Sequence, residues 1–251
     1  MTDTPPFAEL LTLIEDRSAA LHAAASAVPA LDGRVPGCPE WTLDDLVYHL
    51  SEVQRFWSVV VAQADPSGPP SPEQRGATEP PGDLLDWFAE STHLLLDALR
   101  AAEPDTPAWA WWSGSGAPLT VGAIARHQVQ EAAVHAFDGL ETIGKPEPLP
   151  AAIAVDGVAE FVEVGLASCG AWPTRPARLA LSATEGPSWT IDLTPSGARL
   201  NPPVAGDPST TVHASASDLV LSLYGRVPYT DLRVDGDPTV LTELREWSIM
   251  D

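Results

Sequence analysis

The chain has 251 residues, of which 44% are hydrophobic and 19% charged, a composition ordinary for a soluble globular protein. Its formal net charge of -22 repels phosphate backbones and anionic lipids, so nucleic acid and membrane surfaces are poor partners. No apolar run reaches the roughly 20 residues that span a bilayer, and we expect no secretory signal. Cys38 and Cys169 lie far apart and form no metal-type spacing, which favours a reducing cytoplasm.

The first half of the chain has the apolar period of α-helices. We expect a first helix over residues 7–28 and, after the turn-rich residues 31–41, a second that begins at Thr42. The Thr42 side chain can cap this helix, and Asp45 favours the positive end of the helix dipole.

Two more helices are expected in the first half, over residues 84–101 and about 121–140. The stretch 65–83 is too rich in Pro and Gly for a regular element and predicts a long exposed connection. Four amphipathic helices with one long connection predict an antiparallel bundle. The third helix offers the core five apolar side chains: Trp87, Phe88, Leu94, Leu95 and Leu99.

The pattern changes at Gly144–Pro150, which gives predicted domains 1–145 and 151–251. Beyond it, one helix precedes short runs that alternate apolar and polar residues, as strands do. The expected helices cover 151–166, 217–224 and 239–247, and the expected strands lie at 179–181, 189–193, 198–201, around Val212, and at 232–234. The second domain is therefore predicted to be a small α+β domain.

The fourth expected helix carries the most informative pair, Glu131 and His135. Residues four apart stand nearly above one another on a helix, so a carboxylate and an imidazole converge. His49 lies among apolar residues on the second helix and is the candidate partner. A His-Glu-His set leaves an open position for water or substrate, which is the catalytic pattern. Asp138 or Gln128 could hold a ligand in place.

Plainer interpretations remain open at this point. Most Glu–His pairs four residues apart are surface pairs, and a histidine on an apolar face is more often a hydrogen-bonded core residue. His127 could line the same cavity or face solvent. The loop residues Trp109 and Trp111 are either core anchors or the roof of a cavity. Arg226 is either a solvated residue or a clamp for a carboxylate.

Three segments carry a resemblance to a known family. Residues 35–50 (VPGCPEWTLDDLVYHL) and 126–138 (RHQVQEAAVHAFD) resemble the mycothiol-dependent maleylpyruvate isomerase family of the DinB-like superfamily. Residues 224–237 give a weaker match near the end of the family's C-terminal domain. The chain departs from the family pattern at His127 and Gln130, which puts the native substrate in doubt.

The resemblance implies a mostly α fold, with an N-terminal DinB-like four-helix bundle followed by a small sterol-carrier-like α+β domain. It implies a divalent metal, commonly zinc, on His49, Glu131 and His135, with mycothiol as the cosubstrate. It also implies that Arg226 reaches the active site as a catalytic and mycothiol-binding residue. We expect Trp109 and Trp111 to line the same site.

The predicted function is that of a metal-dependent, mycothiol-using enzyme in a cytoplasmic monomer or homodimer. A metal-bound thiolate would attack an electrophilic small molecule. If the adduct expels the thiol after bond rotation, the outcome is cis-trans isomerisation; if it persists, the outcome is S-transfer. The alternatives are a metal-dependent hydrolase that uses a metal-bound water and a non-catalytic small-molecule-binding protein.

Overall fold

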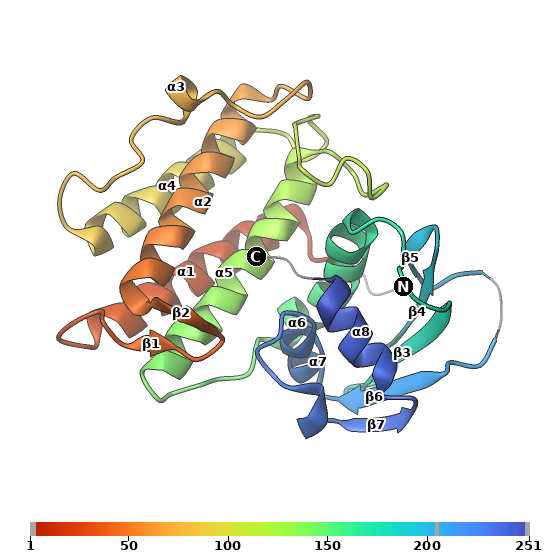
Figure 1. The fold of residues 1–251 in the computed structure, drawn as a ribbon. Helices are drawn as coiled ribbons and strands as arrows, with labels where there is room; N and C mark the ends of the chain where they lie inside the picture. The colour runs from red at the N-terminus through yellow and green to blue at the C-terminus, as the bar shows by residue number, and fades with distance from the viewer. Residues whose placement is uncertain (1–3, 204–205, 249–251) are drawn as a thin grey trace. The chain divides into compact units, whose positions relative to one another are not determined.

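The computed structural model describes residues 4–203 and 206–248 and divides the chain into two units (Figure 1). The helical unit consists of Pro5–Trp111 and Pro118–Leu149. The C-terminal unit consists of the chain from Pro150 onward together with Trp112–Ala117 and Thr4. Each unit is described by itself.

Four long helices form the helical unit, as predicted. They are α1 (Phe7–Ser26), α2 (Leu43–Gln63), α4 (Leu84–Ala101) and α5 (Val121–Thr142). Helix α1 packs against α4 and α5, and α2 packs against the same two helices, so the apolar stripes of all four meet in one core.

Side-chain caps fix where three of these helices begin. Asp45 N donates to the Thr42 hydroxyl at 3.2 Å, and Thr42 N donates to the Asp45 carboxylate at 2.8 Å. This reciprocal pair is the capping box predicted at Thr42, and a cap of this kind stabilises a helix by about 1 kcal/mol. The side chains of Asp83 and Thr120 cap α4 and α5 by accepting hydrogen bonds from backbone N–H groups of the first turn. The register of each helix, and with it the direction of every side chain on the site, is thereby set.

The structure corrects three expectations about the first half. The turn-rich residues before Thr42 form a hairpin, β1 (Arg34–Val35) and β2 (Cys38–Thr42), because Val35 and Trp41 pack on the bundle core. The long connection contains one short helix, α3 (Pro72–Arg75). Leu94 is exposed rather than in the core, since its neighbours Leu95 and Leu96 already occupy the inward face of α4.

The C-terminal unit is built on a five-stranded sheet in the order β5-β4-β3-β6-β7. The strands β3 and β6 are parallel, and every other neighbouring pair is antiparallel. The strands are β3 (Ala177–Ala183), β4 (Ser188–Thr194), β5 (Gly197–Leu200), β6 (Thr210–Ala214) and β7 (Arg233–Gly236). Buried residues alternate along β3 and β4, which is the period that predicted these strands.

Helices accompany the sheet. They are α6 (Ala151–Glu160), α7 (Ala216–Leu223) and α8 (Thr239–Trp247). The helix expected over 151–166 is present, and it changes from α to π geometry at Phe161–Leu166. Mostly helical content with an α+β C-terminal part confirms the predicted fold class.

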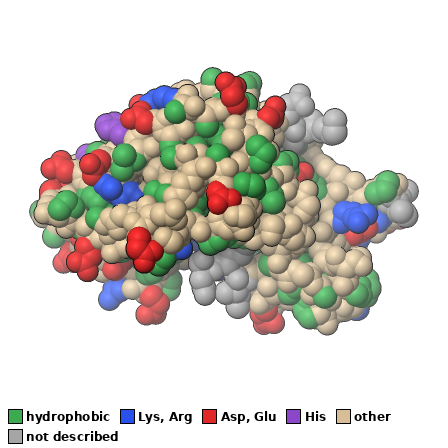
Figure 2. All heavy atoms as spheres, turned by 90° about the horizontal axis from the view of Figure 1, so that it is seen from above, with side chains coloured by type: hydrophobic (Ala, Val, Ile, Leu, Met, Phe, Trp, Pro, Cys, Tyr) green, Lys and Arg blue, Asp and Glu red, His purple; other side chains and the backbone are tan. Residues whose placement is uncertain are grey.

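Acidic side chains are spread over the face that Figure 2 shows, while Lys and Arg side chains on it are few. The chain contains 35 Asp and Glu residues against 13 Lys and Arg residues. Among the helices of the described residues, none combines the length and apolar character needed to cross a membrane.

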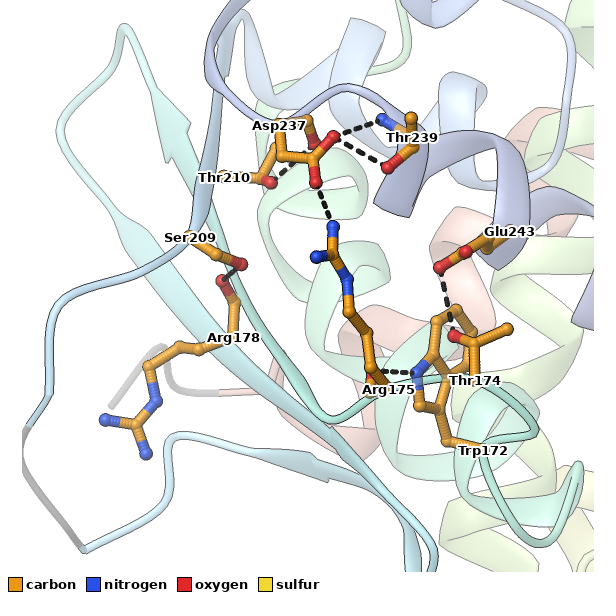
Figure 3. A network of polar contacts seen from close by, with 9 residues as sticks. All are labelled: Trp172, Thr174, Arg175, Arg178, Ser209, Thr210, Asp237, Thr239 and Glu243. Carbon is orange, nitrogen blue, oxygen red and sulfur yellow. Dashed lines mark hydrogen bonds and ion pairs between the residues drawn. The ribbon is translucent and has the colours of Figure 1, made fainter.

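A polar network joins the sheet of the C-terminal unit to the start of α8 (Figure 3). Asp237 accepts a hydrogen bond from the Thr239 hydroxyl at 2.6 Å and forms an ion pair with Arg175. Thr174 donates to Glu243 of α8 at 2.9 Å. These contacts stabilise the C-terminal unit and include none of the predicted site residues.

Candidate metal centre

His49, Glu131 and His135 come together in the helical unit. Each offers one ligand atom, and the three atoms lie within 4.8 Å of one another. His49 lies on α2, and the other two are one turn apart on α5, so two helices supply the set. The rings of His49 and His135 meet edge to face with centroids 5.1 Å apart. The juxtaposition that the sequence left as one possibility is therefore present in the fold.

Glu131 lies between two histidines of its own helix. Its carboxylate oxygens are 3.5 Å from His135 Nε2 and 3.6 Å from His127 Nε2. His127, which could have faced solvent, is instead buried beside this carboxylate. The positions 127, 131 and 135 follow the four-residue spacing that aligns side chains along one helix face.

Asp138 orients His135. Its Oδ2 lies 3.1 Å from His135 Nδ1, and its side chain is completely buried. A carboxylate at this distance favours the proton on Nδ1, so Nε2 is the ring nitrogen that faces Glu131 and that a metal would use. Gln128, the other candidate for this role, has no hydrogen-bond partner for either amide atom among the described residues.

The charges of the cluster reinforce one another. Burial opposes ionisation of Glu131, but the hydrogen bond and charge of His135 outweigh it and lower the pKa of Glu131 to about 2. Burial also opposes protonation of His135, yet its contacts with Asp138 and Glu131 raise its pKa to about 9. The site therefore stabilises a positive charge, which in the metal-free protein is that of the protonated His135 ring.

These residues fit a divalent metal. Nitrogen and carboxylate donors suit zinc and its neighbours, and tetrahedral ligand atoms about 2.1 Å from one ion lie about 3.4 Å apart. The three ligand atoms lie within 4.8 Å of one another, so binding of one ion would draw the side chains closer by roughly 1 Å. Three ligands, one of them held by a buried carboxylate, match a site with an open position.

Trp41 is a wall of this site that the sequence reasoning did not assign. Its ring centroid lies 4.7 Å from that of His49 and 6.2 Å from that of His135. Strand β2 positions it, and its location in the CPEWT segment directly before the Thr42 cap was the available signal.

The predicted tryptophans lie at an aromatic cluster that adjoins the metal ligands. Trp109 stacks on Trp57 with ring centroids 6.2 Å apart. Trp111 meets the ring of His127 at 5.6 Å and is 41% exposed. Trp111 contacts His127 directly and Trp109 contacts it through Trp57, and His127 in turn lies beside Glu131. That these tryptophans bind mycothiol stays a prediction.

Arg226 lies in the C-terminal unit, just after α7. Its Nη1 donates to the carbonyl of Tyr224 at 2.8 Å, and its backbone N donates to the carbonyl of Leu221 at 2.8 Å. The side chain thus contacts the end of its own helix. Its catalytic and mycothiol-binding roles stay predictions.

A pocket of about 280 Å³ opens beside His49 in the helical unit. One side is formed by α2 and the other by the connection between α2 and α4. Besides His49 its lining includes Glu52, Phe56, Trp57 and Arg75. One of the three candidate metal ligands, His49, therefore adjoins a space of small-molecule size.

The fold is thus a helical unit with a possible His-Glu-His metal site, one residue of which lines a pocket, followed by an α+β unit. The family model described as the mycothiol maleylpyruvate isomerase N-terminal domain matches residues 11–138, and that of the C-terminal domain matches residues 152–243. The chain belongs to the mycothiol-dependent maleylpyruvate isomerase family, a family of enzymes. The predicted family membership is confirmed.

Two solved structures share the fold. A crystal structure of a mycothiol-dependent maleylpyruvate isomerase aligns with a TM-score of 0.62 and 20% sequence identity, over 92% of this chain and 93% of that one. A histidine-to-alanine mutant of such an enzyme aligns with a TM-score of 0.59 and 19% identity over the same shares. No curated protein matches the sequence.

Proposed function

We propose that this protein is a mycothiol-using enzyme that holds a divalent metal on His49, Glu131 and His135 and acts on an electrophilic small molecule. The observation that carries the proposal is the convergence of the three ligand atoms within 4.8 Å beside an open pocket. We take mycothiol as the cosubstrate because the family to which the chain belongs is named for its dependence on mycothiol. A reducing cytoplasm, where a free thiol persists, is part of the proposal.

The metal, when bound, lowers the pKa of a thiol that coordinates it, so that the nucleophilic thiolate is available at neutral pH. Asp138 holds the His135 ring in the orientation that presents Nε2. His127 Nε2 lies 3.6 Å from the Glu131 carboxylate, and its charge, when the ring is protonated, stabilises the ionised carboxylate. Trp41 covers the two histidine ligands and excludes water from one side of the site.

The aromatic cluster gives the pocket an apolar wall. Trp57 lines the pocket, and its stacking on Trp109 keeps the Trp57 indole in place. Large rigid rings bury apolar parts of a ligand with little loss of side-chain entropy. We propose that Trp109 and Trp111 contact the cosubstrate and that Arg226 binds an anionic group.

The test uses the full-length protein and the variants His49→Ala and His135→Ala. Both are expected to lose the bound metal and the thiol-dependent turnover, whereas the exposed-residue control Asp97→Asn keeps both. Metal content is measured by atomic emission and turnover by chromatography of the products. An isomerised product identifies an isomerase, and a stable thiol adduct identifies an S-transferase. Full thiol-dependent turnover in either histidine variant contradicts the proposal.

A metal-dependent hydrolase on the same ligands is the competing function. It predicts turnover that does not depend on added thiol, and therefore the same measurement separates the two. Metal-free protein that binds a small molecule without converting it would instead support a binding protein.

A further inference from the structure

The pocket beside His49 contains a cationic group that the proposed function does not use. Two arginines line this pocket, Arg55 from α2 and Arg75 from the last position of α3. Because the metal ligands account for only one pocket residue, His49, the rest of the lining decides which molecule is accepted. The two arginines differ sharply in how they are engaged.

Arg55 is engaged by α4. It forms an ion pair with Glu90 through Nη2, donates from Nε to the Ser91 hydroxyl at 2.8 Å, and lies 4.8 Å above the ring of Trp87. Its charge is balanced by Glu90, and two of its three nitrogen atoms have partners on α4. Arg55 therefore joins α2 to α4 and is not the group that a ligand would meet.

Arg75 is held in place but has unused donors. Its Nε donates to the carbonyl of Pro70 at 3.0 Å, and its guanidinium carbon lies 5.2 Å above the ring of Phe56. Within residues 4–203 and 206–248, neither terminal nitrogen has a hydrogen-bond or ion-pair partner. These two nitrogens form the planar fork that binds a carboxylate with two parallel hydrogen bonds.

The connection that carries Arg75 is tied to α2 at a second point. The Tyr48 hydroxyl donates to the carbonyl of Thr78 at 2.6 Å, and Thr78 also lines the pocket. The segment 70–78 therefore contacts α2 at Arg75 itself, through the ring of Phe56, and at Thr78, through Tyr48. A guanidinium held in this way loses less entropy when it binds a ligand than a free surface arginine does.

The charge of the whole protein makes such a group necessary for an anionic substrate. With a net charge of -22, the surface repels small anions as it repels phosphate backbones. Inside the pocket, Glu52 carries a negative charge and the charge of Arg55 is neutralised by Glu90. Among the side chains that line the pocket, Arg75 is therefore the one whose hydrogen bonds are directed at an anion.

We propose that Arg75 is a specificity-determining residue that binds a carboxylate of the electrophilic substrate in the pocket beside His49. The proposal rests on the proposed function for the reaction and for the carboxylate nature of the substrate, and what it adds is the residue that binds that carboxylate. The substrate carboxylate would lie at the α3 end of the pocket. The reacting carbon would then lie toward His49, which is part of the same lining.

The experiment measures binding of maleate, a small cis-dicarboxylate, by isothermal titration calorimetry. Dimethyl maleate, which has the same carbon skeleton without charge, is the matched probe. The full-length proteins are the wild type, Arg75→Gln, Arg75→Lys and the control Arg100→Gln, which removes an exposed arginine of α4. Arg75→Gln is expected to weaken maleate binding about tenfold or more, with Arg75→Lys in between, because Lys keeps the charge but not the fork.

Dimethyl maleate binding is expected to be unchanged by either substitution at Arg75, and Arg100→Gln is expected to behave as the wild type. Equal maleate affinity in the wild type and Arg75→Gln would overturn the proposal, as would the absence of maleate binding by the wild type at millimolar concentration. The variant His135→Ala keeps the two proposals apart. If His135→Ala still binds maleate, and adding Arg75→Gln to it weakens that binding, the carboxylate site is supported. That result holds even if the metal and the thiol-dependent turnover prove not to depend on His135.

Discussion

Asp138 Oδ2 lies 3.1 Å from Nδ1 of His135, in a position where the aspartate is completely sealed from solvent. A buried carboxylate needs a partner, and here the partner is a ring whose other nitrogen points toward Glu131. The stability of the bundle and the direction of a candidate metal ligand thus depend on the same contact. Four predictions follow from this and other contacts.

We expect Asp138→Asn to weaken metal binding by about 10- to 100-fold while the fold is kept, because the ring loses the carboxylate that favours its Nδ1 proton. Competition with a chromogenic chelator measures the affinity. Asp97→Asn, an exposed substitution on α4, is the matched control and should bind metal as the wild type does. Unchanged affinity in Asp138→Asn would show that the orientation of His135 does not need Asp138.

Metal should stabilise the protein more as the pH rises from 6 to 9. The pKa of His135 is raised to about 9, so in metal-free protein its contacts stabilise the fold fully below about pH 6.5 and are lost as the pH passes 9. The pKa of Glu131 is lowered to about 2, so its contribution is present above about pH 4.5 and is lost toward pH 2. A metal competes with the His135 proton, and its affinity should rise up to about tenfold per pH unit over this range.

The measurement for this prediction is the melting temperature with and without added zinc at a series of pH values. The difference should grow from pH 6 to pH 9 and then level off. A difference that is the same at pH 6 and pH 9 would mean that metal binding displaces no proton from the site.

Two buried glutamines should respond in opposite ways to replacement by leucine. The Gln54 amide donates to the Ser18 hydroxyl at 2.8 Å, and its carbonyl accepts from Thr92 at 2.7 Å, so Gln54→Leu should cost about 1–3 kcal/mol. Neither amide atom of Gln128 has a hydrogen-bond partner among the described residues, so Gln128→Leu should be neutral or stabilising. Urea unfolding measures both, and equal losses would refute the distinction.

Gly236 should not accept a side chain. Its φ is +104°, and an added Cβ would lie 2.2 Å from the carbonyl oxygen of Ser209, which is backbone and cannot easily move. We expect Gly236→Ala to destabilise the C-terminal unit by about 3 kcal/mol or more. Gly186→Ala is the control, since its φ of +116° carries the same conformational strain in open space. Thermal unfolding of both should show the larger loss for Gly236→Ala.

Much of the helical unit could be predicted because local signals determine it. Helix α4 has its predicted bounds, Leu84–Ala101, since Asp83 caps it and its apolar period is continuous. The Glu131–His135 pair follows from helix geometry alone. The meeting of that pair with His49 required either tertiary information or the family resemblance, because spacing within one helix says nothing about the neighbouring one.

The pocket wall could not be predicted from local patterns. The residues around Arg75 are rich in Pro and Gly, and the place of Arg75 depends on the ring of Phe56 and on the bond from Tyr48 to Thr78. These partners are distant in sequence and carry no shared periodicity. Trp41 was missed for a similar reason, since the hairpin that positions it is stabilised by packing on the bundle and not by its own strand propensity.

The short segment Trp112–Ala117 has a consequence for how this protein can be divided. It lies between α4 and α5 in the sequence, yet it belongs to the C-terminal unit, and its Trp112 is fully buried. Cutting the chain at the linker near residue 149 would therefore leave part of one unit attached to the other. Separating the units therefore requires a boundary that keeps Trp112–Ala117 with the C-terminal unit.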